Sequence, residues 1–200
     1  MPYRKEVVDV PAAALLRSAR INRGITQRAL AASCRIHQPG IAAIESGAED
    51  ATVGRLDGIL AHLGSRLSIL PTTLRASWEA ANDIRVHLAV KDERSAWREI
   101  IQLNDDLRSV DGATRVTLVI NPPAPTGDVR FDALLAAIID CALTDDALPL
   151  PTWLKESKYT LSEPWDVEEV PSLRLDARRN TPATLALHGI YLDRSVLVSV

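Results

Sequence analysis

The sequence predicts a mainly α-helical protein built from two domains, and three observations carry that prediction. Apolar residues recur at helical spacing through most of the chain, and turn-forming residues separate these periodic segments. The composition changes after Pro71, which divides residues 1–71 from residues 72–200. We therefore expect a small N-terminal domain of four or five helices with one short β-strand, followed by a mostly helical C-terminal domain with a long ordered coil.

Four short helices are expected near the start of the chain, each bounded by a turn or a cap. Gly24 suits the left-handed residue that ends a helix, and the hydroxyl of Thr26 can accept a free backbone N–H of the next helix. A third helix is expected over His37–Gly47 and a fourth over Ala51–Leu63. The alternation of polar and apolar residues in Arg66–Leu70 predicts the short strand.

The second and third of these helices, joined by a tight turn, form the arrangement that inserts one helix into the major groove of DNA. The helix from Thr26 would cross the sugar-phosphate backbone, and the helix from His37 would read base edges. His37 and Gln38 are its candidate hydrogen-bonding groups, while Ala42 and Ala43 suit contact with a thymine methyl. One copy of this helix would make few base contacts, so we expect the protein to bind as a dimer, which doubles their number.

Two residues in the first turn of that helix are unusual. Pro39 is tolerated because its missing N–H would have no helical partner there, and Gly40 lets the backbone approach a base or a phosphate. The candidate phosphate contacts are Gln27 with its amide and four arginines, Arg23, Arg28, Arg35 and Arg55. Any one arginine could equally be a solvated surface residue.

The charge is divided unevenly along the chain, whose formal net charge is -3. Residues 1–70 hold nine basic and six acidic residues, whereas residues 71–200 hold fourteen basic and twenty acidic ones. Attraction to phosphates depends on the local field more than on net charge, so the basic N-terminal part suits DNA. Without an apolar signal core or a run of eighteen apolar residues, we expect a cytoplasmic protein that does not contact a membrane.

The motifs L-R-x-x-R, G-I-T-Q-x-x-L-A, I-x-x-I-E-x-G and L-x-x-I-L-x-x-L-G together resemble the Xre/Cro family of helix-turn-helix repressors over about 55 residues. The resemblance implies that Arg20 pairs with Glu45, so these two are structural rather than DNA contacts. Where the family usually has a capping serine, this chain has His37. In the antitoxin branch of the family, a strand that resembles Arg66–Leu70 pairs with its copy in a second subunit. The resemblance thus implies a homodimer, and packing of that strand within its own domain is the alternative.

Residues 72–200 are expected to hold several helices. The apolar spacing predicts helices over Thr72–Val90 and over Asp92–Gly112, which could form a hairpin. Arg115–Ile120 is a short β-branched run that suits a strand or a buried coil, and the helix after Asp128 has the strongest apolar face. Four prolines interrupt the stretch Asp145–Thr181, which we expect to be ordered coil.

Nothing in the C-terminal part has the spacing of a catalytic motif. Its paired acidic residues and its histidines match neither metal-ligand nor nucleophile patterns, and Cys34 and Cys141 are too dispersed for a disulfide framework or a metal cluster. We therefore expect no enzyme, no catalytic residue, no metal and no cofactor. An enzyme that carries a DNA-targeting domain remains the least favoured alternative.

The segments PPAPTGDVRFDALLAAII, LPTW, SEPW, PSLRLDA and GIYLD resemble a C-terminal extension of actinobacterial Xre-type regulators. Such regulators are often encoded beside a nucleotidyltransferase-like toxin. The resemblance implies an antitoxin that represses its own operon at an operator and holds the toxin through the C-terminal domain, where Asp166, Glu168 and Glu169 form an acidic cluster. The alternative is a stand-alone regulator whose C-terminal domain binds a small molecule in a pocket lined by tryptophans.

Overall fold

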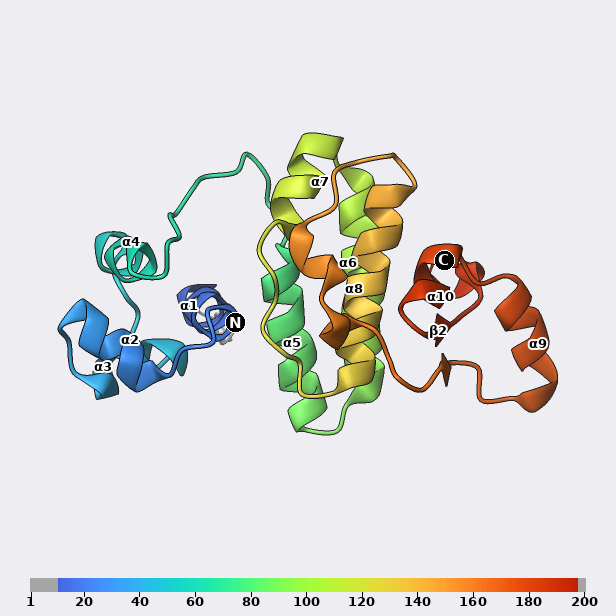
Figure 1. Cartoon of the computed structure of the whole chain (residues 1–200), viewed down its shortest axis with the longest axis horizontal. Helices are drawn as coiled ribbons and strands as arrows, with labels where there is room; N and C mark the ends of the chain where they lie inside the picture. Colours follow the sequence, from blue (N-terminus) through green and yellow to red (C-terminus); the bar gives the residue numbers. More distant parts are fainter. Residues whose placement is uncertain (1–10, 198–200) are drawn as a thin grey trace, which may run out of the picture. The chain divides into compact units, whose positions relative to one another are not determined.

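The computed structural model describes residues 11–197 of the chain, which are mainly helical, as predicted (Figure 1). These described residues contain ten α-helices and one two-stranded sheet. They divide into two compact units between Ile69 and Leu70, two residues before the expected boundary. No helix of the described part is both long and apolar enough to cross a bilayer.

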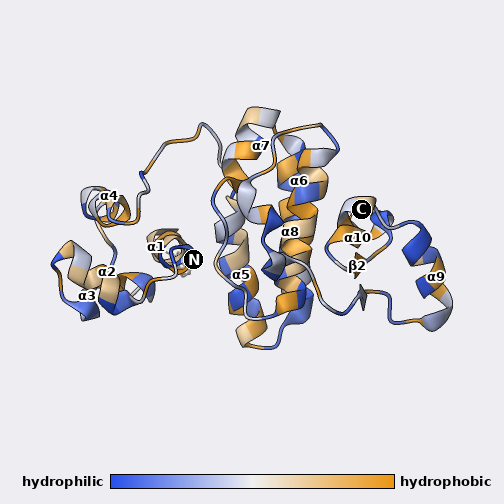
Figure 2. Ribbon diagram, in the orientation of Figure 1, coloured by the Kyte–Doolittle hydropathy of each residue, from blue (hydrophilic) through white to orange (hydrophobic). Residues whose placement is uncertain are grey.

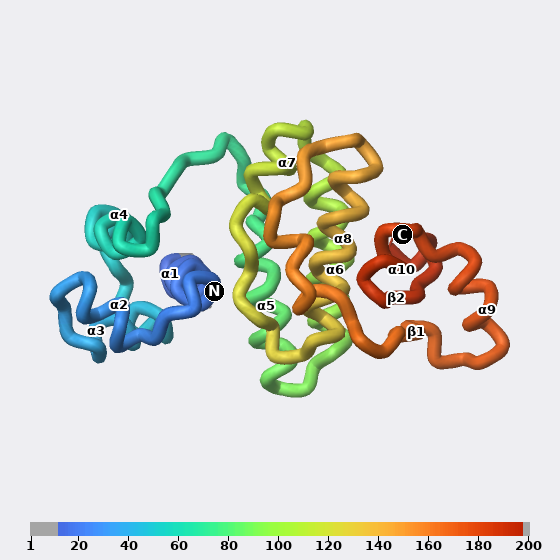
Figure 3. The backbone as a smooth tube through the Cα atoms, in the orientation of Figure 1, coloured from blue at the N-terminus to red at the C-terminus, as the bar shows by residue number. Residues whose placement is uncertain are grey.

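The N-terminal unit consists of four short helices, which the backbone trace in Figure 3 follows. They are α1 (Pro11–Asn22), α2 (Gln27–Cys34), α3 (Gln38–Glu45) and α4 (Val53–Ala61). Thr26 caps α2, because its side chain accepts the N–H of Ala29 at 3.1 Å, and Thr52 caps α4 in the same way. Gly24 follows α1 with a φ of 65°, a conformation that glycine adopts at little cost.

The core of this unit lies where α1, α2, α3 and α4 meet. Each helix contributes fully or almost fully buried side chains, among them Leu16, Leu30, Ile41, Ile44 and Leu60. Burial of one such side chain contributes roughly 1.5–3 kcal/mol relative to leaving it exposed. This packing fixes α3 against α1 and α2, and therefore sets the direction in which the first turn of α3 points.

The expected strand over Arg66–Leu70 is not found. Residues 65–70 have no regular secondary structure, since a strand needs a partner and the described part of this single chain offers them none. The N–H of Leu67 instead donates to a carboxylate oxygen of Asp57 at 3.0 Å, and its side chain packs on the core of the unit. Ile69 is 95% exposed, so the end of the segment is open to solvent.

The second unit is organised around α8 (Val129–Thr144), whose residues are mostly buried. Three helices accompany it: α5 (Ser77–Ala89), α6 (Glu93–Ser109) and α7 (Gly112–Val119). Figure 2 shows the hydrophobic character of α8 beside the mixed surfaces of α5 and α6. The expected hairpin of the two helices before residue 112 is present, because α5 and α6 pack along each other.

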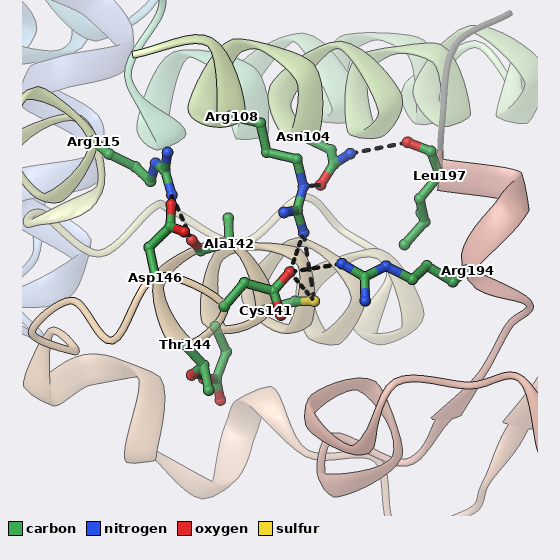
Figure 4. Close-up of polar contacts among 11 residues, drawn as sticks. Asn104, Arg108, Arg115, Cys141, Ala142, Thr144, Asp146, Arg194 and Leu197 are labelled. Atoms are coloured by element: carbon green, nitrogen blue, oxygen red, sulfur yellow. Dashed lines mark hydrogen bonds and ion pairs between the residues drawn. The ribbon is translucent and has the colours of Figure 1, made fainter. Parts of the chain in front are cut away.

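Residues 115–119 of the run Arg115–Ile120 belong to helix α7, so both the strand and the coil expected there are wrong. Asp111 caps α7 by accepting the N–H groups of Ala113 and Thr114 at 3.0 and 3.1 Å. The buried guanidinium of Arg115 donates to the carbonyl of Ala142 at 2.8 Å, which ties α7 to the end of α8 (Figure 4). This cap and this tertiary contact outweigh the preference of β-branched residues for strands.

The stretch Asp145–Thr181, expected as coil, contains short regular elements. They are η1 (Thr152–Lys155), η2 (Ser157–Tyr159), β1 (Trp165–Asp166) and α9 (Pro171–Arg179). After them come α10 (Ala183–Leu187), β2 (Ile190–Tyr191) and η3 (Arg194–Leu197). Strands β1 and β2 pair in parallel with α9 and α10 between them, so the last part of the described chain returns to lie beside β1.

Helix α9 is held to its unit mainly by polar contacts. Ala177 is its buried residue, whereas Leu173 and Leu175 are half or more exposed. Arg178 donates to both carboxylate oxygens of Asp166 at 2.6 and 2.8 Å, and Arg174 donates to backbone carbonyls of the segment before the helix. Arg178 thus neutralises one member of the acidic cluster expected in this region.

The end of the described chain is tied to α6 and α8. Asn104 donates its side-chain amide to the carbonyl of Leu197 at 2.9 Å, a buried contact drawn in Figure 4. Arg108 and Arg194 each approach the same carboxylate oxygen of Asp145 to 2.9 Å. These contacts fix η3 across the two long helices.

Candidate nucleic-acid interface

The turn between α2 and α3 is short and conformationally demanding. Arg35 closes α2 with a φ of 57°, a left-handed conformation that costs a residue with a side chain about 1–2 kcal/mol. The N–H of Ile36 then bonds to the carbonyl of Ala31 at 3.0 Å. His37 begins α3 without a side-chain capping bond, so its imidazole is exposed and free to contact another molecule.

An ion pair joins α1 to the end of α3. Arg20 donates through Nε and Nη2 to the two carboxylate oxygens of Glu45, at 2.6 and 2.7 Å, and through Nη1 to the carbonyl of Ile25. The Glu45 side chain is only 3% exposed. The hydrogen bonds that Arg20 donates to Glu45 raise the pKa of Arg20 against the opposing effect of burial. The Arg20 guanidinium thus connects the turn after α1 to the end of α3, and these bonds hold α3 against α1.

Glu45 also orients the amide of Gln27. Gln27 donates its Nε2 to Glu45 at 2.9 Å, and because a carboxylate can only accept, the amide oxygen must point the other way. That oxygen accepts the Nε2 of Gln38 at 3.1 Å. We call Arg20, Glu45, Gln27 and Gln38 the amide relay. It runs from α1 through the end of α3 and the start of α2 to the first residue of α3.

The relay determines the orientation of the Gln38 side-chain amide, that is, the positions of its oxygen and its nitrogen. With one N–H directed to Gln27, Gln38 keeps its carbonyl oxygen and its second N–H for another partner. An adenine edge in the major groove offers the matching donor and acceptor. Beside Gln38 lies an open groove of about 610 Å³, lined by Arg20, Thr26, Gln27, Arg28 and Gln38.

The predicted arginines fall into two groups. Arg28 and Arg35 are exposed, and their side chains make no hydrogen bond or ion pair within residues 11–197. Arg55, by contrast, forms an ion pair with Glu49. Arg23 approaches the end of α4, where a Cβ added to Gly64 would lie 2.7 Å from its guanidinium. Arg28 is thus the cation beside the groove that is free to meet a phosphate.

The remaining predicted residues lie along α3. Pro39 is exposed in the first turn and Gly40 is half-buried. Ala42 and Ala43 are also half-buried, so they present less surface than the first turn does. The accessible part of α3 is therefore its beginning, with His37, Gln38 and Pro39.

Two interactions lay outside what the sequence analysis expected. The pairing of Arg55 with Glu49 crosses the loop between α3 and α4, and no motif pointed to it. In the second unit, the buried His188 places Nε2 3.2 Å from Asp140 and Nδ1 2.7 Å from the carbonyl of Tyr159. Asp140 and His188 are separated by 48 residues, and only the packing of α10 on α8 brings them together.

The imidazole of His188 faces an acceptor with each nitrogen. Burial acts to lower the pKa of His188, but the hydrogen bonds with Asp140 and Tyr159 outweigh it and hold the pKa above its ordinary value. The hydrogen bond with His188 in turn lowers the pKa of Asp140. This pair joins α10 to α8 as a largely buried ion pair.

Comparison with known proteins finds a match in the N-terminal unit. Residues 16–70 match the model of the helix-turn-helix family, a span that covers α2, α3 and α4 and most of α1. A search of curated proteins and a search of solved structures each returned no match. Residues 16–70 therefore form a helix-turn-helix domain of the kind that DNA-binding transcriptional regulators carry.

Proposed function

We propose that this protein is a sequence-specific DNA-binding repressor, the antitoxin of a toxin–antitoxin pair. Its helix-turn-helix domain would bind the operator of its own operon, and the C-terminal unit would hold a nucleotidyltransferase-like toxin. The observation that carries the DNA-binding part is the amide relay, because it supports Gln38 at the accessible start of α3 with a defined donor and acceptor.

The relay suits readout of an adenine. A glutamine that meets adenine with both its oxygen and its nitrogen discriminates against other bases by about 1–3 kcal/mol. Gln38 would insert with its orientation already set, so less side-chain entropy is lost on binding. Arg28, next to the same groove, would contact a backbone phosphate and add affinity without sequence preference.

The segment after α4 supports a homodimer. Along an extended chain, successive N–H groups point to opposite sides, and the N–H of Leu67 points to Asp57. In a strand over residues 66–70, the N–H of Ser68 would therefore point away from Asp57, and a second copy of the segment could pair with it. Two copies of α3 would then read two half-sites roughly 34 Å apart.

Two features support a partner role for the second unit. It has a hydrophobic core of its own, centred on α8, and residues 71–200 carry a net charge of -6. Negative charge suits a partner whose active site binds nucleotides or RNA, because complementary fields speed association. The exposed apolar residues around α9, which include Val170, Leu173 and Leu175, would add contact area.

Titration of the full chain against labelled duplexes tests the DNA-binding part. Duplexes that tile the DNA upstream of its own gene should include one bound far more tightly than a random-sequence duplex of equal length. Failure to find such a duplex would overturn the assignment of sequence-specific binding.

Co-expression with the tagged product of the adjacent reading frame tests the antitoxin part. We expect the two chains to purify as one complex and the growth arrest caused by that product alone to disappear. Gln38→Ala serves as the matched variant, because it should lose operator binding and keep the protein partner. Continued growth arrest with no complex would contradict the antitoxin role.

A further inference from the structure

The ion pair between Arg55 and Glu49 lies against the first turn of α3. Arg55 stands at the start of α4, and Glu49 lies in the loop between α3 and α4. The guanidinium reaches α3 at Gly40, where an added Cβ would lie 3.4 Å from Nη2. Each side chain of the pair is 39% exposed, so the pair is open to an incoming molecule.

Arg55 and Gln27 flank the first turn of α3 on opposite sides. Residues two positions apart on an α-helix differ by about 200° in direction, so Gln38 and Gly40 face opposite ways. Gln38 contacts Gln27 on one side, and Gly40 adjoins Arg55 on the other. Because a helix with its side chains, about 10–12 Å wide, fills the roughly 12 Å major groove, groups on both flanks meet the two phosphate backbones.

We propose that Glu49 stands in for a DNA phosphate in the free protein. It holds Arg55 beside α3, and on DNA binding Arg55 exchanges this carboxylate for a phosphate of the strand on the Gly40 side. This inference rests on the proposed insertion of α3 into the major groove, and it concerns how much Glu49 lowers the affinity for DNA.

The exchange has two opposing effects on affinity. The pairing holds the Arg55 guanidinium beside Gly40, so little rotamer freedom is lost when a phosphate replaces the carboxylate. However, the pairing must be broken, and that cost exists only when both Arg55 and Glu49 are present. Glu49 therefore weakens binding to any duplex, and its removal strengthens binding only while Arg55 is present.

The test compares Glu49→Gln with Asp50→Asn, each made in the wild-type chain and in an Arg55→Gln chain. Asp50 is the matched control, because it is exposed, adjacent and equally charged but makes no contact with Arg55. The probe is a fluorescein-labelled 30-base-pair duplex of random sequence, titrated by anisotropy over a series of KCl concentrations. Circular dichroism of every variant verifies that the helices remain folded.

We expect Glu49→Gln to tighten binding about fivefold, the upper range for an exposed pair, and Asp50→Asn to change it less than twofold. In the Arg55→Gln background, Glu49→Gln should have no larger effect than Asp50→Asn.

Equal gains for Glu49→Gln and Asp50→Asn would overturn the inference, because the gain would then be a general effect of charge. A gain that persists without Arg55 would overturn it as well. In both cases the wild-type chain binds DNA, so the proposed function stands. If no variant binds the duplex even at low salt, the proposed function fails together with the inference.

Discussion

The amide oxygen of Gln27 accepts a hydrogen bond from the side-chain nitrogen of Gln38 at 3.1 Å, and through this bond the ends of two helices are linked. Gln27 in turn is held by Glu45, which is nearly fully buried. A buried carboxylate therefore determines, through one intermediate side chain, how an exposed glutamine faces solvent. The predictions for DNA binding follow from this arrangement.

Gln38→Ala and Arg28→Ala should weaken DNA binding in different ways. Loss of Gln38 removes a base contact, so binding to the operator should fall by about 1–3 kcal/mol while binding to random DNA changes little. Loss of Arg28 removes a phosphate contact, so both should weaken and the salt slope should fall by about one unit. Anisotropy titrations with both duplexes measure these effects. Unchanged operator binding in both variants would show that α2 and α3 are assigned the wrong roles.

Glu45→Ala should strongly destabilise the N-terminal unit. The change leaves the Arg20 guanidinium, 13% exposed, without its carboxylate, and removal of one member of a buried pair typically costs about 3–5 kcal/mol. Urea unfolding followed by circular dichroism measures the loss. The control is the double variant Arg20→Met with Glu45→Met, which leaves no unpaired charge and should be less destabilised than Glu45→Ala. A double variant at least as unstable would contradict the role of the unpaired charge.

Ser68→Pro should separate dimerisation from folding. Proline removes the N–H that would pair with a second copy of the segment, whereas Ser68→Ala keeps it and serves as the control. We expect Ser68→Pro to be monomeric by analytical ultracentrifugation and to lose tight operator binding, with an unchanged helical signal. Ser68→Ala should behave as the wild type. A dimeric Ser68→Pro chain would exclude pairing of these segments through that N–H.

The stability of the C-terminal unit should fall as the pH rises above 6.5 because of His188. The folded-state pKa of His188 lies above its ordinary value of 6.5, so the protonated imidazole stabilises the fold. That contribution is fully present below pH 6.5 and is lost as the pH rises through the folded-state pKa. Urea unfolding at a series of pH values should show this decrease in the wild type and a smaller decrease in His188→Gln.

Asp140, the partner of His188, affects stability in a separate, acidic pH range. The pKa of Asp140 is lowered from 3.8, so its contribution is present above that value and is lost as the pH falls through the lower folded-state pKa. In Asp140→Asn the imidazole loses its counterion, and the decrease that His188 causes should shift to lower pH. A profile above pH 6.5 that is identical in wild type, His188→Gln and Asp140→Asn would contradict the assignment to this pair.

The sequence was most informative where structure is determined locally. Thr26 marks the start of α2 and Gly24 the end of α1, because capping and left-handed turns depend on near neighbours. The order of the helices in the helix-turn-helix could therefore be predicted. Helix α7 could not be predicted, because its β-branched residues favour a strand. Part of what outweighs that preference is the contact of Arg115 with the distant end of α8. Helix α9 was also missed, because Pro171 looks like an interruption but occupies the first turn, where proline is tolerated.

In the candidate site, too, locally determined features could be predicted from the sequence, whereas contacts between separate elements could not. The first turn of α3 and the arginines around it follow from the order of the helices and their residue types. The bond between Gln38 and Gln27 and the ion pair between Arg55 and Glu49 depend on side-chain directions across a turn or a loop, which periodicity does not encode. The same holds for Asp140 and His188, which only the packing of distant helices brings into contact.

The attachment of α9 through polar contacts affects how readily this helix unfolds locally. With Ala177 as its buried residue and arginine contacts as its main attachment, this helix loses little apolar burial when it detaches. Its opening free energy should therefore lie well below that of α8, and added salt should lower it further. Amide exchange and proteolytic cleavage would begin there while the rest of the unit stays closed, which makes α9 the segment whose order a bound protein can most readily change.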